Sequence, residues 1–175
     1  MTHDNASLNK AMRLAVVTGL RAALGPALLA AARHRPERQH WALAALGEMA
    51  FDKLPFVPSR ASLPMLVPRA LAGAWVTRTI LEEDGAGEDP WAPALGAAVA
   101  VGVATFAPRI RGTLRHLLGV PDFALGIAED YLAIRLGSEA LGLTIDDVRE
   151  VASDSVSEVG SHLLPAAYST GAGSM

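Results

Sequence analysis

Five apolar stretches alternate with polar or proline-rich connections along the first 143 residues. Their apolar positions are mainly alanine and leucine, and aromatic residues are scarce, which favours helices over strands. The pattern predicts helical segments at residues 11–32, 41–57, 65–81, 91–107 and 117–143. The fourth segment has no charged residue between Pro90 and Pro108. Its length of about 18 residues corresponds to about 27 Å of helix, close to the thickness of bilayer hydrocarbon.

Prolines predict interruptions in the first two segments. The pair Gly25-Pro26 lies inside the first segment, and proline lacks the amide donor that a helix interior needs. The second segment has about 17 residues, the lower limit for a membrane span, and ends among Pro55 and Pro58. We therefore expect at least one re-entrant or broken element within residues 20–60, covered by protein or by a water-filled cavity.

The two ends of the chain are more polar than its middle. Thr144 is a predicted N-cap with Asp147 at the third helical position. Apolar residues then recur at helical spacing, so residues 145–159 are expected to form an amphipathic surface helix. We divide the chain into a polar N-terminal end (1–10), a membrane-embedded domain (11–143), and an amphipathic helix with a mobile tail (144–175).

Tryptophans and small residues favour a bilayer over a soluble core. All three tryptophans lie near segment ends, as in an interfacial belt. Small residues recur four apart in the fourth segment and let helices approach closely; they are Gly96, Ala100 and Ala104 in one register and Ala98 and Gly102 in another. The alternative is a soluble helical bundle, since no stretch reaches 20 uncharged residues. Together the features predict an all-α, polytopic transmembrane bundle with four to five membrane-embedded segments.

Composition and charge narrow the possible functions. The chain has no cysteine, which excludes disulfides and thiolate chemistry. Its net charge of −3 argues against nucleic acid as a partner. Basic residues gather at 33–38, 53–69 and 109–115, and acidic residues at 82–90. We expect the basic groups on the cytoplasmic side and the acidic loop opposite. The third basic group contains Arg109, Arg111 and Arg115. It either serves as this topology signal or binds anionic lipid head groups.

Charged residues inside the apolar segments are the candidate functional residues. They are Arg21, Glu48, Asp52, Glu129, Asp130 and Arg135, and each is costly within a bilayer. Glu48 and Asp52 are four apart and share a helix face, where they would bind a cation or carry a proton, or else lie at a helix end near water. We expect Arg21 to pair with Glu48 or Glu129. The alternative is a structural salt-bridge network that fixes helix packing.

Signals for catalysis, metals and cofactors are absent from the sequence. The histidines fall in predicted polar ends or loops, without the spacing of a metal or haem site. Neither a nucleophile elbow nor a glycine-rich nucleotide loop occurs. We therefore expect no catalytic residue, no metal and no cofactor.

The order of motifs resembles that of a known family. TGLRA occupies residues 18–22, E-x-x-x-D-K-x-P residues 48–55, VPSR residues 57–60, and L-G-x-P-D…A-E-D residues 118–130. The arrangement is similar to a bacterial family of small integral membrane proteins that carry a domain of unknown function, over about residues 11–142. The resemblance implies a multi-pass helical protein of the inner membrane and carries no activity.

Three functions fit these observations. The first is a small transporter or channel-like protein whose charged cluster lines a polar path. The second is a non-catalytic accessory or scaffold subunit of a larger membrane complex, with structural charges. A membrane enzyme acting on lipid is the third, supported only by the carboxylates. The expected partners are the lipid bilayer and other membrane subunits or a second copy of the chain.

Overall fold

The computed structural model describes residues 2–51, 62–86 and 89–163, and all regular structure in these ranges is helical. The helices are α1 (Thr2–Leu20), α2 (Leu24–Ala32), α3 (Arg38–Phe51), α4 (Leu63–Glu83), α5 (Ala92–Leu118), α6 (Asp122–Leu141) and α7 (Ile145–Leu163). The all-α prediction is confirmed. Helix α1 begins at Thr2, within the stretch expected to be a polar end, and α6 begins only after Pro121.

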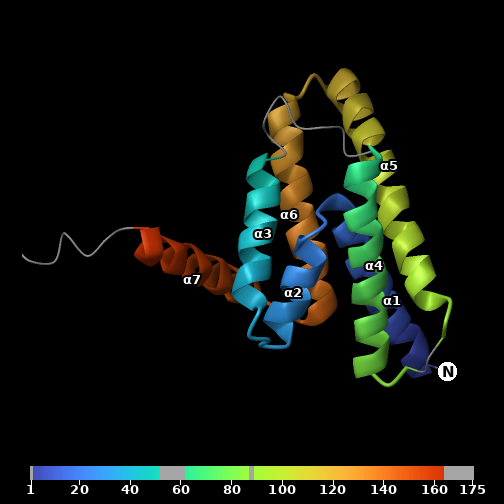
Figure 1. Ribbon diagram of the computed structural model, residues 1–175. Helices are drawn as coiled ribbons and strands as arrows, with labels where there is room; N and C mark the ends of the chain where they lie inside the picture. The colour runs from blue at the N-terminus through green and yellow to red at the C-terminus, as the bar shows by residue number, and fades with distance from the viewer. Residues whose placement is uncertain (1, 52–61, 87–88, 164–175) are drawn as a thin grey trace, which may run out of the picture.

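A break divides the first predicted segment into two helices. Helix α1 ends at Leu20, and α2 leads back toward the end of the bundle where α1 begins (Figure 1). The break lies at residues 21–23 and not at Gly25-Pro26, because Pro26 sits in the first turn of α2, where its missing amide costs no helical hydrogen bond. A Cβ atom on Gly25 would overlap the Thr18 hydroxyl oxygen, so only glycine permits this tight reversal.

Helices α3 to α6 run alongside one another in alternating directions (Figure 1). Helix α4 packs mainly against α5 and α1, whereas α3 packs against α2 and α7. Two apolar clusters form the core, and both are built on the α1–α2 hairpin. One contains Val17, Leu24, Leu28 and Ala133, and the other contains Leu14, Leu29, Val76 and Ile80. The hairpin is therefore the centre around which the longer helices assemble.

Small residues bring α4 and α5 into backbone contact. A Cβ atom on Gly73 would lie 2.8 Å from the Gly96 carbonyl oxygen, and one on Gly96 would lie 2.7 Å from the Gly73 carbonyl oxygen. Gly96, Ala100 and Ala104 are buried, as the predicted close approach requires. The second predicted register faces outward, since Ala98 is exposed and a Cβ atom on Gly102 would have no neighbour within 4 Å.

Helix α7 leaves the bundle and packs mainly on α3 (Figure 1). The predicted cap is present: the Asp147 amide donates to the Thr144 hydroxyl at 3.2 Å, and the Thr144 amide donates to the Asp147 carboxylate at 2.7 Å. Hydrogen bonds from the Thr144 hydroxyl and amide hold the pKa of Asp147 below its ordinary value. This reciprocal cap starts the amphipathic helix where the sequence predicts it.

The basic stretch 33–38 and residues 82–86 of the acidic stretch lie at the same end of the bundle. Arg33 and Arg35 both pair with Glu83, at 2.7 and 2.5 Å. Lys10 pairs with Asp84 at 2.6 Å. The expectation that these stretches lie on opposite sides is therefore wrong. The physical reason is the α1–α2 hairpin, which returns the chain to its starting end, so that α3 and α4 bring residues 82–86 back beside Arg33.

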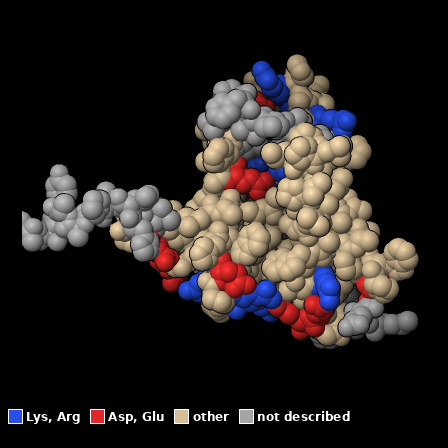
Figure 2. All heavy atoms as spheres, viewed as in Figure 1, with Lys and Arg blue, Asp and Glu red and all other residues tan. Residues whose placement is uncertain are grey.

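Large apolar side chains cover much of the surface between the two ends. Figure 2 shows broad areas without Lys, Arg, Asp or Glu above the charges at the lower edge, interrupted by one group of charged side chains in the upper middle of this face. One helix of the described ranges, α5, is long and apolar enough to cross a membrane, with a mean hydropathy of 1.4. Only 17% of its most apolar 18 residues are buried within the described fold.

Candidate functional site

Arg21 lies at the helix break and is 1% exposed. Its Nε donates to Asp130 Oδ1 of α6 at 2.7 Å, and its Nη2 lies 2.5 Å from the same oxygen. Its Nη1 also donates to the Leu20 carbonyl oxygen at 3.2 Å. The side chain therefore joins the end of α1 to α6 through a buried ion pair, which offsets the cost of removing both charges from water.

Glu48 of α3 closes the break from the other side. Its two carboxylate oxygens accept hydrogen bonds from the backbone amides of Ala22 and Ala23, each at 3.0 Å. These amides precede the first turn of α2, where backbone donors have no partner within the helix. The positive end of the α2 dipole also faces this carboxylate. Glu48 thus provides hydrogen-bond acceptors for the two amides at the helix break and balances the partial positive charge at the start of α2.

Arg69 of α4 completes the arrangement. It is 3% exposed, and its Nη2 donates to Glu48 Oε1 at 2.7 Å while its Nη1 donates to the Met65 carbonyl oxygen at 2.7 Å. We use the name break cluster for Arg21, Glu48, Arg69 and Asp130. It contains two cations and two carboxylates, contributed by the helix break and by α3, α4 and α6.

A second set of charges leads from the break cluster toward the N-terminus of α6. Arg111 of α5 pairs with Asp122 at 2.5 Å and with Glu129 at 3.5 Å. The Asp122 side chain is 52% exposed, whereas Glu129 and Asp130 are 14% and 12% exposed. The carboxylates along α6 therefore pass from the surface to the interior, with an arginine beside each step.

The sequence predicted the wrong partner for Arg21. We expected Glu48 or Glu129, whereas the structure gives Asp130, and Glu48 binds the backbone one and two residues further on. Helix α6 turns toward α1 the face that carries small residues, and Asp130 belongs to this face. Its buried members are Gly126, Asp130, Ala133, Gly137 and Ser138. Small residues at helical spacing around Asp130 were the signal that could have placed it inward.

Arg69 was not among the predicted site residues. It begins the buried face of α4, followed at helical spacing by Gly73, Val76 and Ile80. An arginine in register with glycine and β-branched residues is the pattern of a helix interior that needs a carboxylate partner. Pro64 and Pro68 precede Arg69 in the sequence and suggested a loop, so this periodicity was overlooked.

Other predicted site residues lie elsewhere. Arg135 pairs with Glu139 at 2.8 Å, and both side chains are more than half exposed, so this pair belongs to the surface. Asp52 lies outside the described residues. Arg109 is exposed, with its guanidinium 5.7 Å from the Phe106 ring centre, and Arg115 is exposed near the end of α5. Of the predicted basic group Arg109, Arg111 and Arg115, Arg111 is the member that forms ion pairs with carboxylates of α6.

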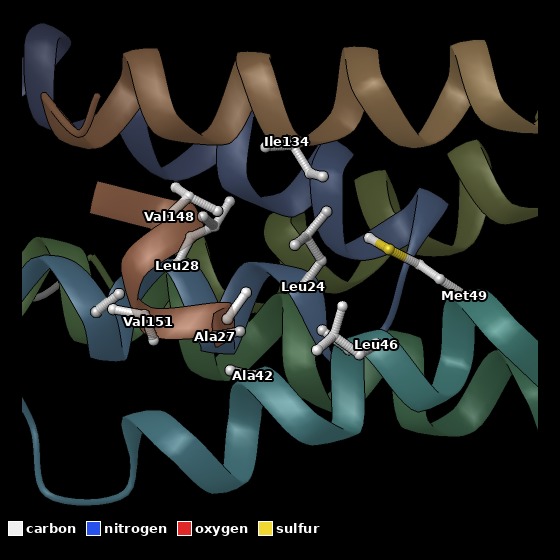
Figure 3. A pocket seen from close by; sticks show the side chains of 12 residues that line it. Leu24, Ala27, Leu28, Ala42, Leu46, Met49, Ile134, Val148 and Val151 are labelled. Carbon is white, nitrogen blue, oxygen red and sulfur yellow. The ribbon is translucent and has the colours of Figure 1, made fainter. Parts of the chain in front are cut away.

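Helix α7 closes an apolar pocket of about 90 Å³ against the bundle. Figure 3 shows side chains from four helices converging on it, including Leu28, Met49, Ile134 and Val148. The lining is almost entirely apolar, so this pocket anchors α7 and offers no group for chemistry. Among the residues that the structure describes, no group of three or more His, Asp or Glu side chains is placed to hold a metal ion.

The break cluster and the α6 carboxylates thus form a set of ion pairs that runs from the surface into the interior, with Arg111 shared by Asp122 and Glu129. Comparison of the chain with protein-family models, with curated proteins and with solved structures finds no match.

Proposed function

We propose that this chain is an integral membrane protein of the multi-pass type, with α1 to α6 embedded in the bilayer. The support is the number of large apolar side chains exposed on the long helices, since extended apolar surfaces mark membrane or protein interaction sites. Large apolar side chains that are at least half exposed include Leu63, Val67 and Leu71 on α4, Trp91, Phe106, Ile110, Leu117 and Leu118 on or next to α5, and Phe123, Tyr131 and Leu132 on α6.

The helix lengths agree with this proposal. Helices α4, α5 and α6 contain 21, 27 and 20 residues, or about 30–40 Å at 1.5 Å per residue, which is enough to span. The α1–α2 hairpin enters and returns as a re-entrant element, and Glu48 supplies its open amides with the partner that a bilayer would not. A place in the bacterial inner membrane, and the family resemblance that suggests it, remain part of the proposal.

Accessibility labelling tests the embedding. Cysteine introduced by Ser62→Cys or Ala86→Cys would lie at opposite ends of α4 in a chain that has no native cysteine. A membrane-impermeant thiol reagent added to sealed spheroplasts should modify one variant and reach the other only after lysis. Modification of both from the same side would contradict the proposed arrangement.

Within the membrane, we propose that the protein conducts or transports a small cation or protons. The observation that carries this is the sequence of carboxylates from exposed Asp122 through Glu129 to buried Asp130 at the tip of a re-entrant hairpin. Intramembrane ionisable residues mark ion and proton pathways, and broken helices mark their binding sites. Each step along α6 offers carboxylate oxygens, and a cation or proton that binds there must replace an arginine as the partner of the carboxylate.

Ion flux into vesicles tests this activity. Purified protein reconstituted in liposomes should dissipate an imposed gradient of H⁺, Na⁺ or K⁺, and Glu129→Gln should lower that flux at least tenfold while thermal unfolding changes little. Glu139→Gln, on the same helix but at the surface, should leave the flux unchanged. Wild-type vesicles that pass none of the three cations would overturn the proposal.

The accessory-subunit function is the second candidate, and the mutual neutralisation of the break cluster favours it. Two arginines and two carboxylates paired in the interior fix helix positions without any need for a substrate. In that case wild-type vesicles pass no cation, Glu129→Gln lowers the unfolding temperature, and a stoichiometric partner copurifies in mild detergent. The reconstitution and the unfolding measurement therefore separate the two functions.

A further inference from the structure

A lateral groove of about 480 Å³ lies between α3 and α4. Its floor is formed by Ala22 of the helix break and Pro26 of α2. Its walls include Trp41 of α3 and Leu71, Ala72 and Trp75 of α4. The volume is in the range of ligand-binding pockets, and the lining is almost wholly apolar. The pairs of helices that pack closely do not include α3 with α4, which is why this space stays open.

Two tryptophans and an arginine define one end of the groove. Trp41 and Trp75 stack with their ring centres 6.1 Å apart. The guanidinium carbon of Arg35 lies 5.7 Å from the Trp75 ring centre, in the geometry of a cation–π contact. Arg35 belongs to the charged end of the bundle, where it pairs with Glu83. The groove therefore leads from a charged end, past the indoles, into the apolar middle of the molecule.

We propose that this groove binds one acyl chain of an anionic phospholipid, with the lipid phosphate beside Arg35. This inference rests on the proposed membrane embedding. The groove opens on the same face as exposed Leu71, so bilayer hydrocarbon would adjoin it. Water gains no hydrogen bonds from an apolar lining and a void forfeits dispersion contacts, so a lipid chain is the occupant that the surroundings supply.

The charges around Arg35 favour a phosphate over a neutral head group. Lys10, Arg33 and Arg35 are ion-paired with only two carboxylates, those of Glu83 and Asp84. This leaves one positive charge in excess among these five groups. Arginine donates to phosphate oxygens in a forked geometry, and basic pockets at the ends of membrane helices bind anionic head groups.

Quenching of tryptophan fluorescence by lipids brominated on their acyl chains tests the site. The variant Trp41→Phe/Trp91→Phe retains Trp75 as the sole tryptophan, which can be excited selectively over the two tyrosines. In vesicles, its quenching should reach half of its maximum at a several-fold lower mole fraction of brominated phosphatidylglycerol than of brominated phosphatidylcholine. Adding Arg35→Gln should abolish this preference, whereas Arg78→Gln, an exposed arginine of α4, should retain it.

Filling the groove gives an independent measurement. Ala72→Leu adds bulk inside the groove and should lower Trp75 quenching at least twofold, while Ala98→Leu on the exposed face of α5 should have no effect. Equal quenching by the two lipids, or quenching insensitive to both Ala72→Leu and Arg35→Gln, would overturn the proposed site.

A reference fluorophore separates this failure from failure of the membrane proposal. Leu95→Trp on exposed α5, in a background with all three native tryptophans changed to Phe, should be quenched by both lipids in proportion to their mole fractions. If it is not quenched, the chain is not embedded and the proposed function fails. If it is quenched while Trp75 shows no preference, only the acyl-chain site fails.

Discussion

Helix α4 has two flanks that pack in opposite ways. Toward α5, Gly73 and Gly96 allow the two backbones to touch, with no space for a Cβ atom on either residue. Toward α3, bulky Leu71 and Trp75 face Trp41 across a groove of about 480 Å³. The same helix is thus locked on one side and separated from its neighbour on the other.

The difference shows how side-chain size sets helix separation in this bundle. Small residues place α4 and α5 at a distance where dispersion contacts between backbones replace side-chain packing. On the other flank the indole rings hold α3 away from α4 at one end, and the start of α2 holds it away at the floor. We expect changes at the locked flank to destabilise the fold and changes at the open flank to alter mainly what occupies the groove.

The largest effect should come from adding bulk at the locked flank. In Gly73→Leu, the Cβ atom would lie 2.7 Å from the Ala100 Cβ and 2.8 Å from the Gly96 carbonyl oxygen. Because neither backbone can yield locally, we expect a loss of at least about 3 kcal/mol in the free energy of unfolding. Denaturant titration in detergent micelles, followed by circular dichroism, measures it. The matched control is Gly47→Leu on α3, where nothing lies within 4 Å of the added Cβ.

Two glycines of α5 provide a smaller and better matched comparison. Gly96→Ala would drive a methyl group into the Thr77 hydroxyl oxygen, and we expect a loss of about 1–3 kcal/mol. Gly102→Ala meets nothing within 4 Å and should gain about 0.5–1 kcal/mol from helix propensity. The same titration should move the two midpoints in opposite directions. Equal shifts would show that α4 and α5 are not locked by glycine contact.

The stacked indoles provide the contact across the open flank. A double-mutant cycle with Trp41→Phe, Trp75→Phe and the double variant would isolate this contact, and residual ring stacking keeps the expected coupling near or below about 1 kcal/mol. Replacing the same residues with Ala should give a coupling of about 0.5–1.5 kcal/mol. A coupling of zero in the Ala cycle would mean that the start of α2 alone sets the width of the groove.

The smallest predicted effect on stability concerns Asp84, at the charged end of the bundle where it pairs with Lys10 and Arg33. Burial raises the pKa of Asp84, but hydrogen bonds from Lys10 and Ser7 and the charges of Lys10 and Arg33 outweigh it, so the pKa lies below its ordinary 3.8. A lowered carboxyl pKa stabilises the fold above 3.8, and that stability is lost as pH falls from there through the folded-state pKa.

We therefore expect the free energy of unfolding to fall on acidification below pH 3.8. Part of this fall is due to Asp84 and should be absent in Asp84→Asn. The change should be below about 1 kcal/mol, because the pairs at this end are partly exposed. Thermal unfolding at several pH values would measure it. An identical pH profile for the variant and the wild type would show that the ion pairs of Asp84 with Lys10 and Arg33 do not contribute to the pH dependence of stability.

Helix class and most helix positions follow from the sequence because they depend on local composition. Apolar stretches rich in alanine and leucine predicted α4 and α5, and Thr144 with Asp147 predicted the start of α7. The helix break was expected near Gly25-Pro26 but lies at residues 21–23, because the position of a break depends on which carboxylate can reach the freed amides. That carboxylate, Glu48, is contributed by a different helix.

The pairing of charges was harder to predict for the same reason. Glu129 and Asp130 are adjacent in sequence but about 100° apart around a helix. The rotation of α6 is set by its small-residue face, so Asp130 and not Glu129 meets Arg21. Arg69 was missed although its register with Gly73 and Val76 marks the buried face of α4. Local sequence patterns thus identified the candidate charged residues, whereas their pairing depends on tertiary packing.

Arg21 and Asp130 are 109 positions apart along the chain. At about 5–20 residues per second, a ribosome needs on the order of 5–20 s to advance that far. During that interval the arginine has been synthesised and its carboxylate has not. The guanidinium of Arg21 must therefore stay hydrated or find a temporary partner, and the α1–α2 hairpin can take its final position only after α6 has been made.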